Sequence, residues 1–280
     1  MRISTQQIYH QFTRSLNRQQ LELNSTQLRI QTGKKDISTD GVALAKSIQL
    51  NAEKQKNESY LDTMALVDSR LQLEQKAVES LVTEMNRMKQ LAINASSDTF
   101  NDNDMLQSEL KNMRDTLVDI TNTKQNDEFI FSGNSVHTPS LDDMGNWNGD
   151  TNQRSVKIAD ESTVQFGSVT GNELFSEQLF DKINNTISQG ELDPELLKQV
   201  NQTIDNMALS LAGIGTHMNH IDTQRQVTLD HSLIIEEKLV NTEDADLAES
   251  ISKLMAQQTA MQASMKTFNQ LTSMSLFDMM

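Results

Sequence analysis

Apolar residues recur at alternating intervals of four and three along residues 60–95, and this spacing constrains the fold more than any other feature of the chain. It places the residues in one stripe on a single face of an α-helix, as in a coiled coil. At about 1.5 Å per residue the run spans roughly 54 Å, so the sequence predicts a rod that buries its stripe against another helix. The stripe has one polar member, Glu74, and consists of Tyr60, Met64, Val67, Leu71, Glu74, Val78, Leu81, Met85, Met88, Ala92 and Ala95.

Two further runs repeat this spacing. The first predicts a second helix that ends near residue 125. The other follows Asp193-Pro194-Glu195, in which an N-cap residue, a proline and an acid mark a helix start, and continues to about Leu239. Residues 46–130 and 194–241 are therefore predicted to form a domain of long antiparallel helical rods. The two stripes are Leu106, Leu110, Met113, Leu117 and Ile120, and Leu197, Val200, Ile204, Met207, Leu211, Ile214, Met218 and Ile221.

Both ends of the chain carry the pattern at lower density. It predicts amphipathic helices at 1–32 and 244–280, each of which needs a partner for its apolar stripe. The rods would bring both ends of the chain together, so we expect the two helices to pair. Residues 1–45 and 242–280 are thus predicted to form a terminal helical domain for assembly. The stripes are Tyr9, Leu16, Leu23 and Ile30, and Leu247, Ile251, Leu254, Gln258, Met261, Met265 and Phe268.

Residues 131–193 have a different composition from their flanks, because they hold six of the ten glycines and one of the two prolines, Pro139, while the other, Pro194, follows directly. Apolar and polar residues alternate over Val156–Ile158 and Thr163–Val169, which is typical of short β-strands. We expect a small β-rich insertion domain at the tip of the rods. The predicted fold class is therefore mainly α, a coiled-coil-like bundle of long antiparallel rods with paired terminal helices and this insertion.

Composition excludes several classes of function. With 24 basic and 39 acidic residues the net charge is −15, which argues against a nucleic-acid partner. No apolar run approaches the ~18 residues that cross a bilayer, so we expect no membrane span. The first ten residues lack the apolar stretch of a cleaved signal, and the chain has no cysteine for a disulfide or a thiol nucleophile.

Candidate chemical sites are weak. His217 and His220 have the spacing of two metal ligands on a helix, but only Asp222 lies within a turn of them, so they are interpreted as polar surface residues. Residues 142–153 are rich in Asp, Asn and Gly, yet the required glycine and glutamate of a calcium loop do not fall into place. No catalytic or nucleotide-binding motif occurs. We therefore expect no enzyme activity, no cofactor and no metal.

Sequence motifs occur at four separate points of the chain: Met1–Thr5, Leu28–Lys35, Phe129–Gly133 and, at the last point, Thr259–Phe268 with Ser275–Phe277. In this order they resemble the flagellin superfamily, and within it the proteins that join the flagellar hook to the filament. One departure is Ser38-Thr39-Asp40-Gly41, which lacks the proline usual in the family, although Asp40 can still cap a helix.

The resemblance implies a secreted structural protein of the extracellular bacterial flagellum, exported by the flagellar type III pathway without a cleaved signal. It implies a tubular ring of subunits as the assembled form, with a neighbouring hook-associated protein and flagellin as further partners, and a cytoplasmic export chaperone before secretion. Two alternatives stay open. A filament flagellin would share the ends, and a cytoplasmic coiled-coil scaffold would share the heptads but has no reason for a β insertion.

The candidate site is a surface for assembly rather than a pocket. The resemblance places the stripe of the C-terminal helix on the inner wall of the tube, where it would contact neighbouring subunits. The predicted interface residues are Phe12, Leu16, Leu23, Ile30, Ile251, Leu254, Met261, Met265, Phe268, Leu276 and Phe277.

Overall fold

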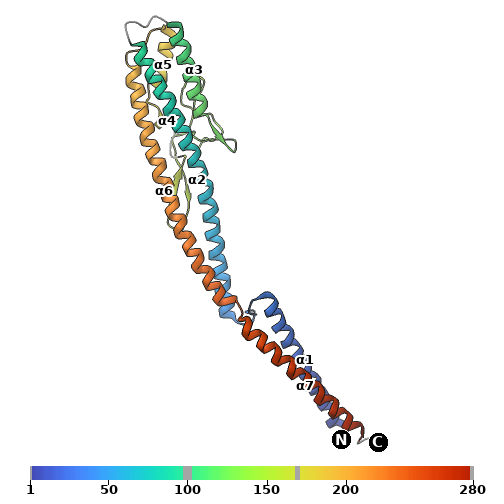
Figure 1. Cartoon of the computed structure of the whole chain (residues 1–280). Coiled ribbons are helices and arrows are strands. Elements are labelled where there is room, and N and C mark those ends of the chain that lie inside the picture. The colour runs from blue at the N-terminus through green and yellow to red at the C-terminus, as the bar shows by residue number, and fades with distance from the viewer. Residues whose placement is uncertain (1, 97–102, 168–170, 278–280) are drawn as a thin grey trace. The chain divides into compact units, whose positions relative to one another are not determined.

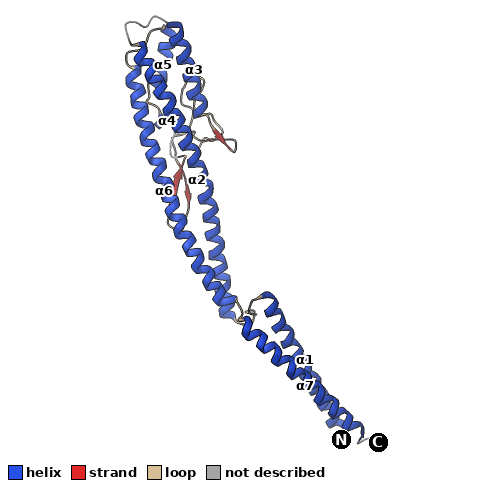
Figure 2. Ribbon diagram, viewed as in Figure 1, coloured by secondary structure: helices blue, strands red, loops and turns tan. Residues whose placement is uncertain are grey.

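The structure, a computed structural model, describes residues 2–96, 103–167 and 171–277, without the side chains of residues 2–6, 8, 172 and 271–277. It divides into two compact units (Figure 1), unit 1 with residues 1–55 and 232–280 and unit 2 with residues 56–231. Most described residues are helical, and Figure 2 shows only short strands. The expectation of a mainly α fold built on long helices is confirmed.

Unit 2 is built on two long helices, α2 (Gly41–Ala95) and α6 (Leu196–Glu243). They run antiparallel, since Asn57 contacts His231 at 3.2 Å while Asp68, farther along α2, pairs with Arg225, earlier in α6, at 3.6 Å. Nearly all of the stripe predicted on residues 60–95 is buried between these helices and their neighbours. The fully buried members are Met64, Leu71, Glu74, Val78, Leu81, Met85, Met88 and Ala92 on α2, with Val200, Met207, Ile214 and Ile221 on α6.

A third helix, α3 (Asn103–Thr121), packs on this frame through Leu106, Leu110 and Leu117, and Arg87 of α2 pairs with Glu109 at 3.0 Å. It ends four residues before the predicted position. Asn126 and Asp127 have φ values of 51° and 63°, the left-handed conformation of a two-residue hairpin turn. The chain therefore leaves the helix to pair β1 (Lys124–Gln125) with β2 (Glu128–Phe129).

The window from 131 to 193 differs from the prediction in content and in position. It holds one antiparallel strand pair, β3 (Arg154–Lys157) with β4 (Thr163–Phe166), and two helices, α4 (Gly171–Leu174) and α5 (Leu179–Gln189). The strand pair lies along α2 rather than at a tip, because Asp160 accepts a hydrogen bond from the Tyr60 hydroxyl at 3.1 Å. The predicted strand also included Gly167, Ser168 and Val169, but β4 ends at Phe166. Ser168 and Val169 lie outside the described residues.

The reason for this correction is burial. Ile158 and Val164 of the hairpin are almost fully shielded, and they belong to the same apolar core as the stripes of α2 and α6. Two strands of four residues are not stable alone, so they pack on the rod. Helix α5 lies against α3 and was missed, although Leu179, Phe180 and Ile183 have helical spacing and Gly190 closes the helix with φ of 74°. The three predicted domains stay predictions.

Glu74 shows why the stripe of α2 contains a polar residue. Its Oε1 accepts the backbone N–H of Gly167 at 2.8 Å and Arg70 Nε–H at 3.3 Å, so it fastens the end of β4 to the rod. Arg70 in turn pairs with Glu128 at 3.6 Å and donates to the carbonyl of Ile130 at 3.2 Å. Burial is the largest influence on Glu74 and raises the pKa of its carboxyl to about 7, against the neighbouring Arg70 charge.

This raised pKa predicts a pH-dependent stability. Between pH 4.5 and about 7 the Glu74 carboxyl holds a proton in the folded chain that it has lost in the unfolded chain. The free energy of unfolding is therefore highest below pH 4.5, falls as the pH rises, and has lost this contribution above about pH 7. Glu74→Gln keeps an acceptor for Gly167 and cannot ionise, while Arg70 keeps Glu128. We expect it to raise the free energy of unfolding at pH 8 by about 1–3 kcal/mol and to flatten its dependence between pH 5 and 8. Urea titrations at several pH values measure both, with exposed Glu58→Gln as the control, and an unchanged pH profile in Glu74→Gln would contradict the assignment.

Candidate assembly surface

The terminal helices α1 (Arg2–Thr32) and α7 (Leu247–Phe277) pack side by side in unit 1 (Figure 1). The rings of Phe12 and Phe268 stack nearly parallel, with their centroids 4.3 Å apart. The ring centroid of Tyr9 lies 5.5 Å from that of Phe268. Farther along α1, Gln19 donates to the hydroxyl of Ser264 at 3.5 Å. These contacts give an antiparallel pair, and the expectation that the ends of the chain meet is confirmed.

The shared face of this pair is half polar. On α7 every second shielded residue is a serine or a glutamine. Among the apolar side chains of α1 and α7 that the structure describes, only Leu23 is buried. Polar residues in a seam fix its register but weaken it. The seam consists of Phe12, Leu16, Gln19, Leu23, Thr26 and Ile30 on α1, and Ser250, Leu254, Gln257, Met261, Ser264 and Phe268 on α7.

The predicted interface residues therefore fall into three groups. Ile251 and Met265 are 43% and 44% exposed, so they lie outside the seam. Leu276 and Phe277 lie outside the residues whose side chains the structure describes. The remaining seven are turned toward the other terminal helix of the same chain, and they are Phe12, Leu16, Leu23, Ile30, Leu254, Met261 and Phe268.

A second apolar surface remains open on unit 1. Of the twenty exposed large apolar side chains among the described residues, thirteen belong to this unit, although it is the smaller of the two. Monomeric proteins rarely leave large contiguous apolar patches in water. These residues lie on α1, α2, α6 and α7, and together they are called the open apolar surface of unit 1 below. Sequence reasoning missed part of it, since it read a single stripe on each helix. The thirteen are Tyr9, Leu21, Leu28, Val42, Leu44, Ile48, Leu233, Ile234, Val240, Leu247, Ile251, Met255 and Met265.

Helical geometry shows how the two surfaces relate on α1. Leu21 and Leu28, 69% and 60% exposed, are seven residues apart and share one face. Leu23 and Ile30 occupy the opposite face and point toward α7. The sequence already indicated a second stripe, because Leu21 and Leu28 are separated by one heptad, as Leu23 and Ile30 are.

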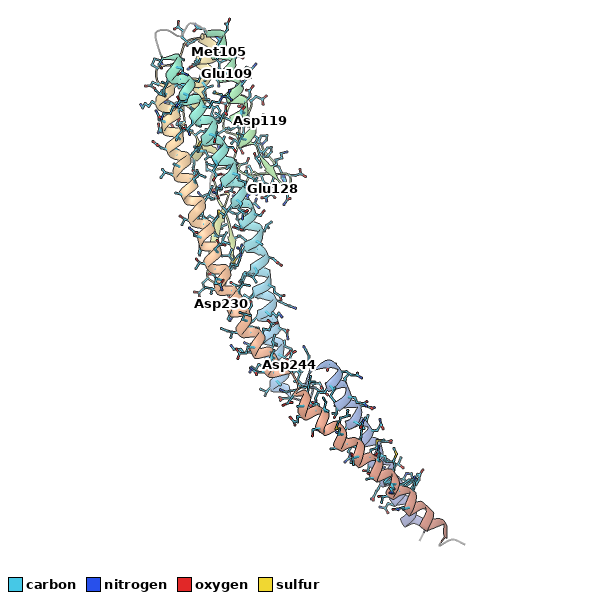
Figure 3. All side chains as sticks on the ribbon, viewed as in Figure 1. Met105, Glu109, Asp119, Glu128, Asp230 and Asp244 are labelled. Atoms are coloured by element: carbon cyan, nitrogen blue, oxygen red, sulfur yellow. The ribbon has the colours of Figure 1, made fainter. Side chains whose placement is uncertain are left out.

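Charge is distributed as unevenly as apolar surface. Unit 1 has eleven basic and eleven acidic residues, whereas unit 2 has thirteen basic and twenty-eight acidic ones. The whole net charge of −15 therefore resides in unit 2, where Glu109, Asp119 and Glu128 show its acidic side chains (Figure 3). Two copies of unit 1 can approach without net repulsion.

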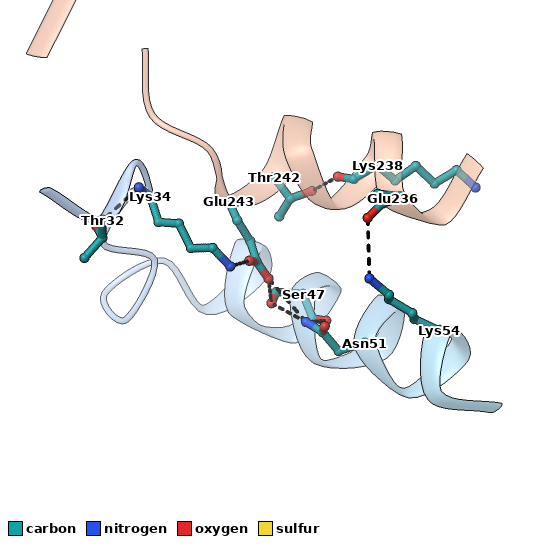
Figure 4. Close-up of polar contacts among 9 residues, drawn as sticks. All are labelled: Thr32, Lys34, Ser47, Asn51, Lys54, Glu236, Lys238, Thr242 and Glu243. Atoms are coloured by element: carbon teal, nitrogen blue, oxygen red, sulfur yellow. Dashed lines mark hydrogen bonds and ion pairs between the residues drawn. The ribbon is translucent and has the colours of Figure 1, made fainter. Parts of the chain in front are cut away.

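Glu243, the last residue of α6, holds together the connections that lead into α2 and α7 (Figure 4). Its carboxylate accepts hydrogen bonds from Lys34 Nζ at 2.6 Å, Ser47 Oγ at 2.5 Å and Asn51 Nδ2 at 3.2 Å. Its carbonyl accepts the backbone N–H of Lys35 at 2.6 Å. These hydrogen bonds, that of Lys34 first, hold the pKa of the Glu243 carboxyl below its ordinary value.

The segment between α1 and α2 is ordered by local caps. Gly33, with φ of 69°, ends α1, and its carbonyl accepts the N–H of Ala245 at 2.8 Å. Asp40 accepts the N–H groups of Val42 and Ala43 at 3.1 Å, so it caps α2 without the proline usual in the resembling family.

Sites for small ligands are poorly developed. Beside these connections unit 1 has an open groove of about 850 Å³, lined by charged and apolar residues alike, among them Asp40, Val240 and Lys253. The described residues contain no cluster of three histidine, cysteine or acidic side chains that could bind a metal, and His220 contacts Ser162 Oγ at 3.2 Å instead. None of the described helices has a stretch apolar and long enough to pass through a bilayer.

Comparison with known proteins agrees with this architecture. A model of the bacterial flagellin N-terminal helical region matches residues 3–136. Over 315 aligned residues the chain is 25% identical to flagellar hook-associated protein 3 of Escherichia coli strain K12, and the alignment covers all of this chain and 99% of that one. The resemblance to the flagellin superfamily is confirmed.

Solved structures share the fold of this chain. Flagellar hook-associated protein 3 of Legionella pneumophila has a TM-score of 0.63 at 14% identity, over 69% of this chain and 98% of that one. The flagellar junction protein FlgL of the same organism has a TM-score of 0.58 at 14% identity, over 70% and 99%.

The hydrogen bonds of Glu243 predict a local change when its side chain is removed from this flagellin-like chain. Glu243→Ala deletes three acceptor contacts, so we expect faster amide hydrogen exchange at Lys35 and Ala245. The global free energy of unfolding should fall by about 1 kcal/mol or less, because Lys34 is largely exposed. Since the pKa of Glu243 is lowered, its contribution is present above about pH 4.5 and is lost as the pH falls further.

Exposed Glu237 on the same helix provides the matched control, Glu237→Ala. If both variants leave exchange at Lys35 and Ala245 as in the wild type, Glu243 does not hold these connections.

Proposed function

We propose that the chain is a structural subunit of the bacterial flagellum at the junction between hook and filament, and that it assembles with copies of itself into a tubular ring through unit 1. The observation that carries the proposal is the open apolar surface of unit 1, which lies on a unit without net charge. The similarity to flagellar hook-associated protein 3 over the whole chain supports the location at the junction.

The burial balance of unit 1 supports assembly through it. Besides Leu23, the buried apolar residues of this unit are Leu50 and Ile235 among the side chains that the structure describes, and the other large ones described are partly or largely in water. Each Å² of apolar surface removed from water contributes about 25 cal/mol, so a neighbouring copy that covers several such side chains stabilises both copies. Unit 2 has little left to gain, because its core is nearly complete.

Further partners follow from the same location. In the assembled flagellum the subunit contacts a neighbouring hook-associated protein on one side and flagellin on the other, outside the cell. Before export, a cytoplasmic chaperone covers the stripe of α7 in our proposal. The exposed Leu247, Ile251 and Met255 give such a chaperone an apolar face to bind.

A junction protein, a filament flagellin and a cytoplasmic scaffold differ in the phenotype that deletion of the gene produces. Loss of a filament flagellin removes the filament protein itself, and loss of a cytoplasmic scaffold leaves the flagellum intact. Deletion of this gene should leave hooks in place, with flagellin exported but not attached, and the chain should be recovered from sheared flagella of the wild type. Attached filaments in the deletion strain would exclude the junction role.

The division between seam and open surface predicts two different mutant phenotypes. Met265→Asp places a carboxylate on the open surface, so we expect normal helicity in circular dichroism but no incorporation and no filament attachment. A carboxylate enclosed at a subunit contact loses hydration that costs several kcal/mol. Met261→Asp puts the same charge into the α1–α7 seam, and we expect it to lose helicity as well.

Lys266→Glu is the control, because Lys266 is exposed and is not part of the apolar surface. It should attach filaments as the wild type does. Filament attachment by Met265→Asp would show that the open surface of α7 is not a subunit contact.

A further inference from the structure

The methionines of the chain separate into shielded and exposed ones. Met64, Met85 and Met88 have no exposed surface, and Met113 and Met207 have at most 2%. Four methionines among the described residues are instead between 44% and 63% exposed, and they are Met105, Met144, Met255 and Met265. The side chains of these four are within reach of dissolved oxidants, and one of them, Met144, also accepts a hydrogen bond from Arg114 Nη1 on its sulfur at 3.9 Å.

Two of the four lie on the open apolar surface of the C-terminal helix. Met255 is 63% exposed and follows Leu247 and Ile251 at intervals of four, and Met265 is 44% exposed farther along the same flank. On a helix these intervals keep the side chains on one side. The other two exposed methionines are in unit 2, where Met105 stands at the start of α3 (Figure 3) and Met144 in the loop before Trp147.

We propose that Met255 and Met265 form an oxidation-sensitive modification site, and that peroxide acting on the unassembled subunit converts them to sulfoxides and prevents docking of a second copy. The second part of this statement rests on the proposed function. The modification itself depends only on the exposure of the two side chains.

The reaction is a two-electron oxygen transfer from a peroxide. A lone pair of the thioether sulfur attacks one peroxide oxygen, the O–O bond breaks, and the other oxygen leaves as hydroxide and takes up the proton of the transferred oxygen. Sulfur is oxidised to the sulfoxide, and hydrogen peroxide is reduced to water. The step converts a flexible apolar side chain into a polar one.

The sulfoxide oxygen is a strong hydrogen-bond acceptor that water satisfies while the surface is open, and an apolar contact surface on a second copy would offer it no donor. Contact with a second copy would remove water from that oxygen without replacing the hydrogen bond, which opposes association. Met261 is partly shielded in the α1–α7 seam, so it should react more slowly. Docking should protect Met255 and Met265 in turn, because it covers their sulfur atoms.

The first test is the order of reaction. The purified full-length chain is treated with dilute hydrogen peroxide, the reaction is stopped with free methionine, and sulfoxides are mapped by peptide mass spectrometry over time. We expect Met255 and Met265 to react about tenfold faster than Met64, Met85 and Met88, as exposure dictates. Equal rates at exposed and shielded methionines would overturn the assignment of the site.

The second test links oxidation to assembly by sedimentation. Peroxide should reduce assembly of the wild type severalfold, and the double variant Met255→Leu, Met265→Leu should keep its assembly after the same treatment. The double variant Met105→Leu, Met144→Leu removes two methionines of similar exposure from unit 2 and should remain as sensitive as the wild type. Equal loss in both double variants would overturn the proposal.

Addition of peroxide after assembly provides a third readout. We expect Met255 and Met265 to be protected in the sedimented material, whereas the same two residues react in the soluble subunit. Reaction at equal rates in both would overturn the link to docking. If the untreated chain does not assemble, the proposed function fails, and the order of oxidation rates alone still decides whether the site exists.

Discussion

The antiparallel packing of α2 on α6 is the constraint on which the rest of the structure depends. Two helices of 55 and 48 residues bury stripes that repeat every three and four positions, and the cores of α3, of α5 and of the β3–β4 hairpin all join the same cluster. None of the short elements could persist alone, since two strands of four residues or a single eleven-residue helix bury too little surface. The seam of the long helices therefore fixes the position of everything in unit 2.

The same spacing has a different outcome in unit 1, and the difference explains the function. The seam of α1 and α7 alternates apolar residues with glutamine, threonine and serine, so it holds the helices in register without removing most of their apolar surface from water. Among the described residues, the buried Oε1 atoms of Gln19 and Gln257 have no hydrogen-bond partner, which weakens the pair further. A weak pair with an open apolar face and no net charge is suited to exchange contacts with neighbouring copies.

The sequence was sufficient for the long elements and insufficient for the short ones. Heptad spacing located α2, α3 and α6 and the terminal pair, because a stripe that long has no other stable arrangement. It missed α5 and the β1–β2 hairpin, whose formation depends on what they pack against and on the left-handed turn at Asn126 and Asp127. For the candidate surface, spacing placed Leu254, Met261, Met265 and Phe268 on one face of α7, and all of these but Met265 are partly shielded. Periodicity cannot tell whether a stripe faces the same chain or another copy. That distinction needs the exposed fractions of Met265 and Leu21.

Polar residues in the two seams show how one heptad pattern serves stability in one unit and exchange in the other. Glu74 is enclosed, and its Oε1 accepts hydrogen bonds from Arg70 at 3.3 Å and from the N–H of Gly167 at 2.8 Å, which hold the strand pair to α2, while its Oε2 has no partner among the described residues. Gln19 has one partner at 3.5 Å, and its second polar atom has none among the described residues. When the α1–α7 seam opens, water can hydrogen-bond to Gln19 again. When the α2 seam opens, the apolar core of unit 2 is exposed to water. Under the proposed function, the contacts that exchange between copies therefore lie in unit 1, which has no net charge, and the complete core lies in the acidic unit 2.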